Sequence, residues 1–239
     1  MLEDVWETVE GIVAAAGGPP AADSAPAASV DVKVTLRDGR LLSGTVPGVG
    51  GDVLRSVTYS RVNPRHRLVA WVRLLALAAA YPDVPFEAAT IGRARFGAHH
   101  HAQVTVARVP PLASDPAGRR ELALAHLATL ADLYDRGMRE PLPLACFSSA
   151  AYAVAAAGGA DAAAAARGEW ESERYDKEDR EPEHELVLGG VRTFADVLAE
   201  APRADETGDG WEAAEPARFG RYARRLWAGL LACEQVTER

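Results

Sequence analysis

The stretch VDVKVTLRDGRLLSGTV, residues 30–46, decides the class of fold that this chain can adopt. Apolar and polar residues alternate over 30–36, and a second short run covers 41–46. Alternation with a period of two is typical of β-strands, and an Asp-Gly pair between two such runs is a strong hairpin signal. The stretch therefore predicts two antiparallel strands joined by the turn Arg37–Arg40.

Further strands and helices are predicted after this hairpin. A third strand is expected over 53–59, and two more over 87–94 and 103–109. A helix should begin at Asn63-Pro64, a good N-cap followed by the residue favoured at the first helical position, and end before Pro82. Later helices are expected at 116–136, at 148–166 with a break at Gly158-Gly159, at 197–199 and at 218–235. The order predicts an α/β (α+β) domain with a mixed sheet flanked by helices and a helical C-terminal part.

Two segments precede this domain. Residues 1–16 carry apolar residues at helical spacing, and we interpret them as a helix left from a preceding domain. Residues 17–29, GGPPAADSAPAAS, are rich in Gly, Pro, Ser and Ala without apolar periodicity, so they predict a flexible linker. The compact domain is accordingly expected over 30–239.

The composition is ordinary for a globular protein, with 48% hydrophobic and 25% charged residues. The formal net charge of −8 argues against an autonomous, non-specific nucleic-acid binder, although a local basic patch remains compatible with it. No apolar run is long enough to span a bilayer, and the acidic first residues do not match a secretory signal. We therefore expect a cytoplasmic protein without a membrane partner.

Several stretches, taken in their order and spacing, resemble the RecC family. They are LLSGTVPGV (41–49), VTYSRVNPRHRLVAWVRLLAL (57–77), ATIGRA (89–94), LYDRGMREPLPL (133–144), SSAAYA (148–153), EHELVLGG (183–190) and RFGRYARRLW (218–227). The resemblance implies the fold of PD-(D/E)xK nucleases, at the end of a long subunit of the helicase–nuclease exodeoxyribonuclease V. It also implies RecB and RecD as partner subunits and double-stranded DNA ends or forked DNA as the ligand. ATP and Mg²⁺ would be held by other subunits, so no cofactor is expected in this domain.

Three positions bear on whether this domain could cleave DNA. Active nucleases of that fold carry an acidic residue at the end of one strand and Asp-x-Lys on the next, because Mg²⁺ needs carboxylate oxygens. Laying this pattern on the chain puts Pro47 at the first acid, and Thr58 and Ser60 at the Asp and the Lys. None of the three binds Mg²⁺ strongly or carries positive charge. We therefore expect no catalysis from this domain; Asp52, in the nearby turn, is the acid that an active nuclease would have to use.

A basic cluster surrounds the predicted helix start at Pro64. It consists of Arg61, Arg65, His66 and Arg67. Cations beside the free N–H groups of a helix start suit an anion, so contact with the DNA backbone is one interpretation. The other is that these residues pair with acidic residues of this domain or of a neighbouring subunit.

A second candidate patch lies on the strand before the loop 95–102. It consists of Arg93 and Arg95, and a solvated sheet edge is the alternative interpretation. The loop itself is the candidate for the element that, in the family, helps separate the two DNA strands. Its three adjacent histidines, 99–101, would point to alternate faces of an extended chain and so indicate a polar loop rather than a metal site.

Other polar groups in the second half of the chain favour structural explanations. The segment 181–185 lacks the H-E-x-x-H spacing of a zinc hydrolase and is predicted to be a solvated charged segment or a docking surface. Ser148-Ser149 is predicted to be a helix cap. In the last helix an apolar stripe is predicted to be buried with the arginines outside, the alternative being contact of its aromatic residues with a partner or DNA. That stripe comprises Phe219, Tyr222, Leu226 and Leu230.

The leading hypothesis is a non-catalytic scaffold and DNA-channel domain of a RecBCD-type helicase–nuclease that processes double-strand breaks. Such a domain would help to hold and split duplex DNA and to dock the partner subunits. An active magnesium-dependent DNA nuclease and a pure protein–protein docking domain are the two alternatives.

Overall fold

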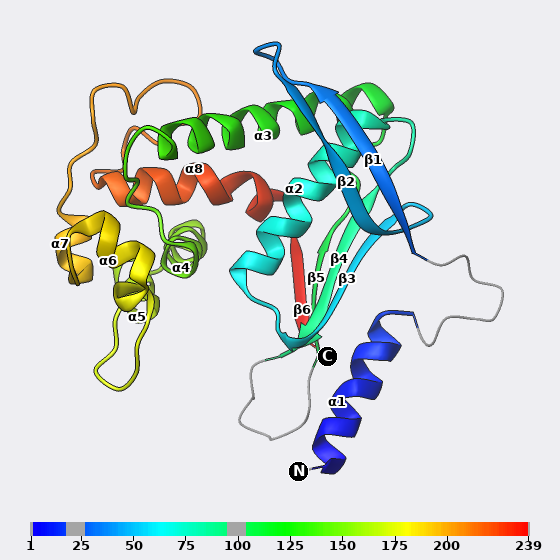
Figure 1. Ribbon diagram of the computed structural model, residues 1–239, viewed down its shortest axis with the longest axis horizontal. Coiled ribbons are helices and arrows are strands. Elements are labelled where there is room, and N and C mark those ends of the chain that lie inside the picture. The colour runs from blue at the N-terminus through cyan, green and yellow to red at the C-terminus, as the bar shows by residue number, and fades with distance from the viewer. Residues whose placement is uncertain (1, 18–26, 95–103, 239) are drawn as a thin grey trace. The chain divides into compact units, whose positions relative to one another are not determined.

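The computed structural model describes residues 2–17, 27–94 and 104–238, and it divides into two compact units (Figure 1). Unit 1 comprises Met1–Ala128 and Cys233–Arg239, and unit 2 comprises Thr129–Ala232. Most of the predicted linker 17–29 lies outside the described residues, and the boundary of the domain predicted over 30–239 stays a prediction. No helix within the described residues is both long and apolar enough to cross a membrane.

Unit 1 is built on a six-stranded mixed sheet in which each strand pairs with its neighbour in sequence. The strands are β1 (Ala28–Thr35), β2 (Leu41–Gly50), β3 (Val53–Arg61), β4 (Glu87–Arg93), β5 (Val104–Val109) and β6 (Gln235–Glu238). All pairs are antiparallel except β3–β4, which is parallel. The β1–β2 hairpin turns at Gly39, whose φ of +84° explains the need for glycine in the Asp-Gly pair. The predicted mixed α/β class is confirmed.

Helix α2 (Pro64–Ala80) makes the parallel pair possible, because parallel strands need a crossover connection and α2 links β3 to β4. Its start follows from the sequence: the Asn63 side chain accepts a hydrogen bond from the His66 N–H at 3.1 Å, and Pro64 fills the first turn. One face of the helix is completely buried, including Trp71 and Leu74. The predicted end before Pro82 is confirmed.

Helix α1 (Leu2–Ala15) packs on the sheet of unit 1 through Ile12, which lies in one buried cluster with Ile91 of β4 and Val104 of β5. The approach is close at Gly11, where a Cβ atom would lie 2.9 Å from the Val104 side chain. The predicted helix is therefore present, and a face made of small and apolar residues fixes it on the sheet.

Unit 2 is helical, as predicted, and includes the end of α3 (Pro116–Gly137) and most of α8 (Arg218–Cys233). Between them lie α4 (Cys146–Ala157), α5 (Ala162–Trp170), the 3-10 helix η1 (Glu178–Arg180), α6 (Pro182–Leu188) and α7 (Phe194–Leu198). The break predicted at Gly158-Gly159 separates α4 from α5. The main core cluster comprises Ala145, Tyr152, Ala166, Trp170, Phe194, Val197, Phe219 and Ala223.

The helix predicted over 218–235 is too long. It ends at Cys233, and the next residues form strand β6, where Gln235 pairs with Arg108 of β5. The sequence gives no local signal for this strand, because the hydrogen-bonding edge that it completes lies more than a hundred residues earlier in the chain.

The predicted cap at Ser148-Ser149 is wrong. Both serines lie inside α4, fully buried, and the N-cap residue is Ala145, which makes no side-chain capping bond. Glu178 supplies the cap instead: its carboxylate accepts from the N–H groups of Phe147 and Ser148, both at 2.7 Å.

The segment 181–185, predicted to be a solvated charged segment or a docking surface, leads into the short helix α6, in which no residue is buried. The prediction of solvent-facing arginines on the last helix needs correction. On α8 the apolar stripe is confirmed, since Phe219, Tyr222 and Leu230 are fully buried. Arg225 does not face solvent, however, because its side chain is 10% exposed and donates to Asp132 at 3.0 Å.

Candidate nucleic-acid interface

The candidate interface lies in unit 1, where the parallel strands β3 and β4 end. Arg61, the last residue of β3, and Arg93, the last residue of β4, are directly paired in the sheet. Helix α2 begins three residues after Arg61, so its first turn follows at once. The crevice beyond the carboxyl ends of parallel strands is a common place for ligands in α/β proteins.

A bulge in β3 shapes this edge. From Val57 to Arg61 β3 advances four residues, while β4 advances only two, from Ile91 to Arg93. A Cβ atom at Gly92 would lie 2.6 Å from the Ser60 carbonyl oxygen. The close approach of the bulged strand to β4 therefore requires glycine at this position, and bulges of this kind re-aim the side chains that they carry.

The bulge also carries two of the three positions that were assigned to lost nuclease residues. Thr58 Oγ1 and Ser60 Oγ lie 2.9 Å apart, and Thr58 Oγ1 accepts a second hydrogen bond from the Ser60 N–H at 3.1 Å. Two neutral hydroxyl groups that bond to one another are weak ligands for a hard cation such as Mg²⁺.

Pro47, the third position, is not brought to the other two. Strands β2 and β3 are in register only at Val49–Leu54 and Gly50–Val53, so Pro47 has no pairing partner at Thr58 or Ser60. Its side chain is exposed on β2. Within 2–17, 27–94 and 104–238, no group of three or more His, Cys, Asp or Glu residues is arranged to hold a metal ion.

Arg67 and His66 both have partners within unit 1. The Arg67 Nε atom donates to both carboxylate oxygens of Glu234, at 3.0 and 2.9 Å, and the two side chains are 14% and 3% exposed. This is the pairing within the domain that the sequence left open as an alternative. The Nδ1 atom of His66 accepts from the Asn63 N–H at 3.4 Å and so completes a capping box at the start of α2.

The start of α2 is therefore a poorer anion site than its basic sequence suggests. Pro64 has no N–H group, and the His66 N–H is already bonded to Asn63. An anion would have to use the arginine side chains instead. Arg61 and Arg65 are exposed, and Arg93 is half-buried. Arg95 and the loop 95–102 lie outside the described residues, so what was predicted for them stays a prediction.

One residue of this surface was missed by the sequence reasoning. Tyr59 is 45% exposed, and the Arg93 guanidinium carbon lies 5.3 Å from the centre of its ring. Part of the signal was available in the sequence, because Arg55, Val57, Tyr59 and Arg61 occupy every second position of the chain there, and all four are exposed in the structure.

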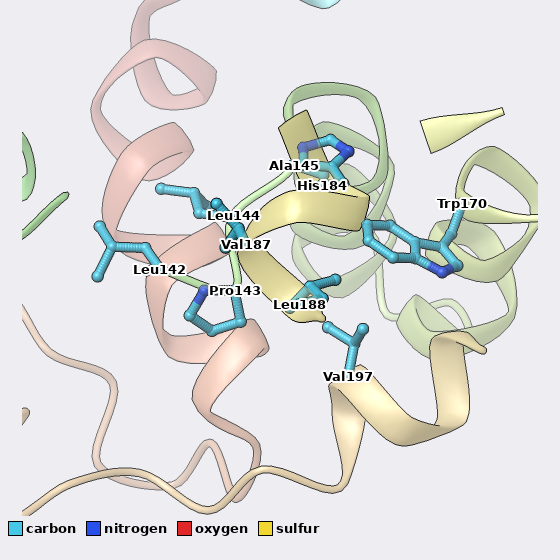
Figure 2. A pocket seen from close by; sticks show the side chains of 9 residues that line it. All are labelled: Leu142, Pro143, Leu144, Ala145, Trp170, His184, Val187, Leu188 and Val197. Atoms are coloured by element: carbon cyan, nitrogen blue, oxygen red, sulfur yellow. The ribbon is translucent and has the colours of Figure 1, made fainter. Parts of the chain in front are cut away.

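Unit 2 contains a small apolar pocket that is lined by side chains from α5, α6 and α7 and from the loop before α4 (Figure 2). The lining residues are Leu142, Pro143, Leu144, Ala145, Trp170, His184, Val187, Leu188 and Val197. The cavity measures about 10 Å³, which is room for roughly one water molecule. It is too small to be a binding site for a metabolite.

The charged side chains buried in unit 2 form a hydrogen-bonded group around Glu206 and Arg218. Burial by itself would raise the pKa of the Glu206 carboxyl, but hydrogen bonds from the Arg203 N–H, from Arg218 and from Tyr222 outweigh it and hold that pKa below its ordinary value. For Tyr222, burial and the bond to Glu206 raise the pKa of the hydroxyl. Arg218 pairs with Glu206 and Glu200, and Glu206 also accepts from the Tyr222 hydroxyl, so the group holds the loop before α8 in place.

Comparison with known proteins identifies the family of this chain. The family model for the RecC C-terminal domain matches residues 1–157. A protein named RecBCD enzyme subunit RecC, from Mycobacterium tuberculosis, is 40% identical over 204 residues, which are 85% of this chain and 17% of the relative. The protein of the same name from Mycolicibacterium smegmatis is 40% identical over 205 residues, 86% of this chain and 17% of that relative. The chain thus spans about a sixth of the length of these relatives, and it belongs to the RecC family.

Proposed function

We propose that this chain is a non-catalytic scaffold and DNA-channel domain of a RecBCD-type helicase–nuclease that repairs double-strand breaks. It would help to hold and split duplex DNA and would dock the RecB and RecD subunits. ATP and Mg²⁺ would be bound by those subunits, and the complex would act in the cytoplasm. The relatives carry the name of this enzyme's RecC subunit, and the chain matches their sequence over 85–86% of its length.

The observation that carries the proposal is the edge formed by β3 and β4. The nuclease pattern, laid on the sequence, puts an acid and a lysine at the positions of Thr58 and Ser60, and the hydroxyl groups of these two residues bond to each other. Beside them, exposed Arg61 and Arg65 offer positive charge without a metal ligand. An edge that keeps cations, and that has no metal-binding cluster among the residues the structure describes, supports holding DNA rather than cutting it.

The DNA contact is tested in the assembled complex by substituting Arg61→Gln and Arg65→Gln together. Binding of a blunt duplex end would be measured at several salt concentrations. If each arginine neutralises one phosphate, the slope of log Kd against log salt falls by about 1.8, because each phosphate contact contributes about 0.9. Arg37→Gln is the matched control, since Arg37 is an exposed cation of the same unit in the β1–β2 turn.

Two results would contradict the proposal. An unchanged salt slope in the double variant, together with normal assembly with RecB and RecD, would contradict DNA contact and indicate a pure protein–protein docking domain. Magnesium-dependent cleavage of DNA by the purified chain, abolished by Asp52→Ala, would establish an active nuclease.

A further inference from the structure

One face of the bulged end of β3 combines apolar, aromatic and cationic side chains. We call Arg55, Val57, Tyr59 and Arg61 the β3 stripe; all four are exposed, with Val57 at 50% and Tyr59 at 45%. Arg55 and Val57 are two residues apart, about 6.7 Å in an extended strand, and the bulge between Val57 and Arg61 carries Tyr59. Exposure of Val57 and Tyr59 between two arginines is unusual, since exposed positions of a strand are most often polar.

The Tyr59 ring is held from one side. The Arg93 guanidinium carbon lies 5.3 Å from the ring centre, a cation–π contact between neighbouring strands. This contact restricts the rotation of the ring and places a positive charge over one of its faces. The two features that a nucleotide needs, a flat surface for the base and a cation for the phosphate, therefore meet at one residue pair.

The backbone that carries Tyr59 is fixed by packing. Gly92 lets the bulged strand approach β4 to a distance that no other residue would allow, because a Cβ atom there would lie 2.6 Å from the Ser60 carbonyl oxygen. The hydroxyl groups of Thr58 and Ser60 bond to each other on the flanks of Tyr59. Pre-organisation of this kind is what a binding surface needs in order to avoid an entropic cost on binding.

Helix α1 ends beside the first member of this stripe, because a Cβ atom at Gly17, two residues after the helix, would lie 4.0 Å from Arg55 Nη2. Its Ile12 covers Ile91 of β4 and Val104 of β5, which lie further along the sheet. Val57, although it is paired with Ile91 in the sheet, keeps half of its surface exposed. Within the described residues, Val57 and Tyr59 are about half exposed, beside the part of the sheet that α1 covers.

We propose that the β3 stripe is a stacking site for unpaired bases of a single DNA strand, with Tyr59 as the stacking platform and Arg55, Arg61 and Arg93 facing the phosphates. This inference rests on the proposed DNA-channel function. Cationic surroundings select a polyanion, and the exposed ring selects its unpaired part, because bases inside a duplex stack on one another and leave no face for a tyrosine. Recognition through a stacked ring and phosphates is independent of base sequence.

The test uses the complex assembled with its partner subunits and two DNA probes of equal duplex length. One probe is blunt, and the other ends in a dT tail that carries 2-aminopurine near the junction. Tyr59→Ala should weaken binding of the tailed probe by about 5- to 100-fold and abolish the quenching of 2-aminopurine on binding. Its salt slope should stay unchanged, since no phosphate contact is lost.

Two further variants separate stacking from misfolding. Tyr59→Phe keeps the ring and should bind the tailed probe within about twofold of the unsubstituted protein. Tyr134→Ala removes an exposed tyrosine of unit 2, 66% exposed, and should have no effect on either probe.

The outcomes distinguish this inference from the proposed function. If Tyr59→Ala binds and quenches normally while the Arg61/Arg65 double variant shows the reduced salt slope, the stacking site is wrong and the DNA-channel function stands. If neither variant changes DNA binding, both are wrong. If Tyr59→Ala prevents assembly with the partner subunits but Tyr59→Phe does not, the stripe is a protein-docking surface and the stacking site is again wrong.

Discussion

Arg218 and Glu206 form an ion pair that is almost completely removed from water: the Arg218 Nε atom donates to Glu206 Oε1 at 2.6 Å, and the side chains are 1% and 0% exposed. Glu206 also accepts from the Tyr222 hydroxyl at 2.9 Å and from the Arg203 N–H at 2.9 Å. Because charges are costly to bury without partners, the pair ties the loop between α7 and α8 to the first turn of α8.

Removal of Arg218 should therefore be strongly destabilising. Arg218→Met leaves the Glu206 carboxylate buried without its cation, and loss of one partner of a buried pair costs about 3–5 kcal/mol. Urea denaturation followed by tryptophan fluorescence would measure the change. Arg167→Met is the control, because Arg167 pairs with Glu171 at 2.6 Å but is 71% exposed, so its loss should cost about 0.3–0.5 kcal/mol. Equal effects of the two variants would contradict this account.

The same pair predicts how stability depends on pH. The pKa of the Glu206 carboxyl lies below its ordinary value of 4.5 in the folded chain, so the folded state binds the proton less readily than the unfolded state. Its contribution is present above the unfolded pKa and is lost as the pH falls through the folded pKa. We expect the melting temperature to fall as the pH is lowered from about 4.5, and to fall less steeply in Glu206→Gln. Parallel curves for the two proteins would show that other carboxyl groups govern acid unfolding.

Glu178 should behave as the cap of a helix that lies thirty residues earlier in the chain. Its carboxylate accepts from the N–H groups of Phe147 and Ser148 at the start of α4, and it is 4% exposed. Glu178→Ala leaves these donors buried and unpaired, at a cost of about 1–3 kcal/mol. Glu173→Ala, in the exposed part of the same segment, should change the free energy of unfolding by less than about 0.5 kcal/mol. A thermal melt of each variant would reveal the difference, and a melt of Glu178→Ala that overlays the parent curve would rule out the cap.

Gly92→Ala should disturb the β3 bulge. The added Cβ atom would lie 2.6 Å from the Ser60 carbonyl oxygen, and the backbone would have to move at a cost of about 1–3 kcal/mol. Gly44→Ala is the matched control on β2, because a Cβ atom there meets nothing within 4 Å. Hydrogen exchange of the β3 amides should accelerate in the first variant and remain unchanged in the second. Unaltered hydrogen exchange in Gly92→Ala would mean that the bulge accommodates the methyl group without a change in β3, contrary to this prediction.

What the sequence by itself determined are the features that depend on neighbours in the chain. The Asp-Gly hairpin, the Asn63-Pro64 helix start and the break at Gly158-Gly159 all follow from the backbone preferences of a few adjacent residues. The sequence also determines that Thr58 and Ser60 carry hydroxyl groups, which are weak Mg²⁺ ligands in any fold, while their assignment to nuclease positions stays a prediction.

Tertiary structure alone decided the rest, because the partners come from distant parts of the chain. Arg67 and Glu234 are 167 residues apart, and without the fold Arg67 could not be told from its exposed neighbours Arg61 and Arg65. Strand β6 and the Glu178 cap are of the same kind, since each satisfies backbone groups that a remote segment exposes. Local pattern says which groups need a partner, but only the packed chain says which partner reaches them, since that depends on distances that sequence separation does not encode.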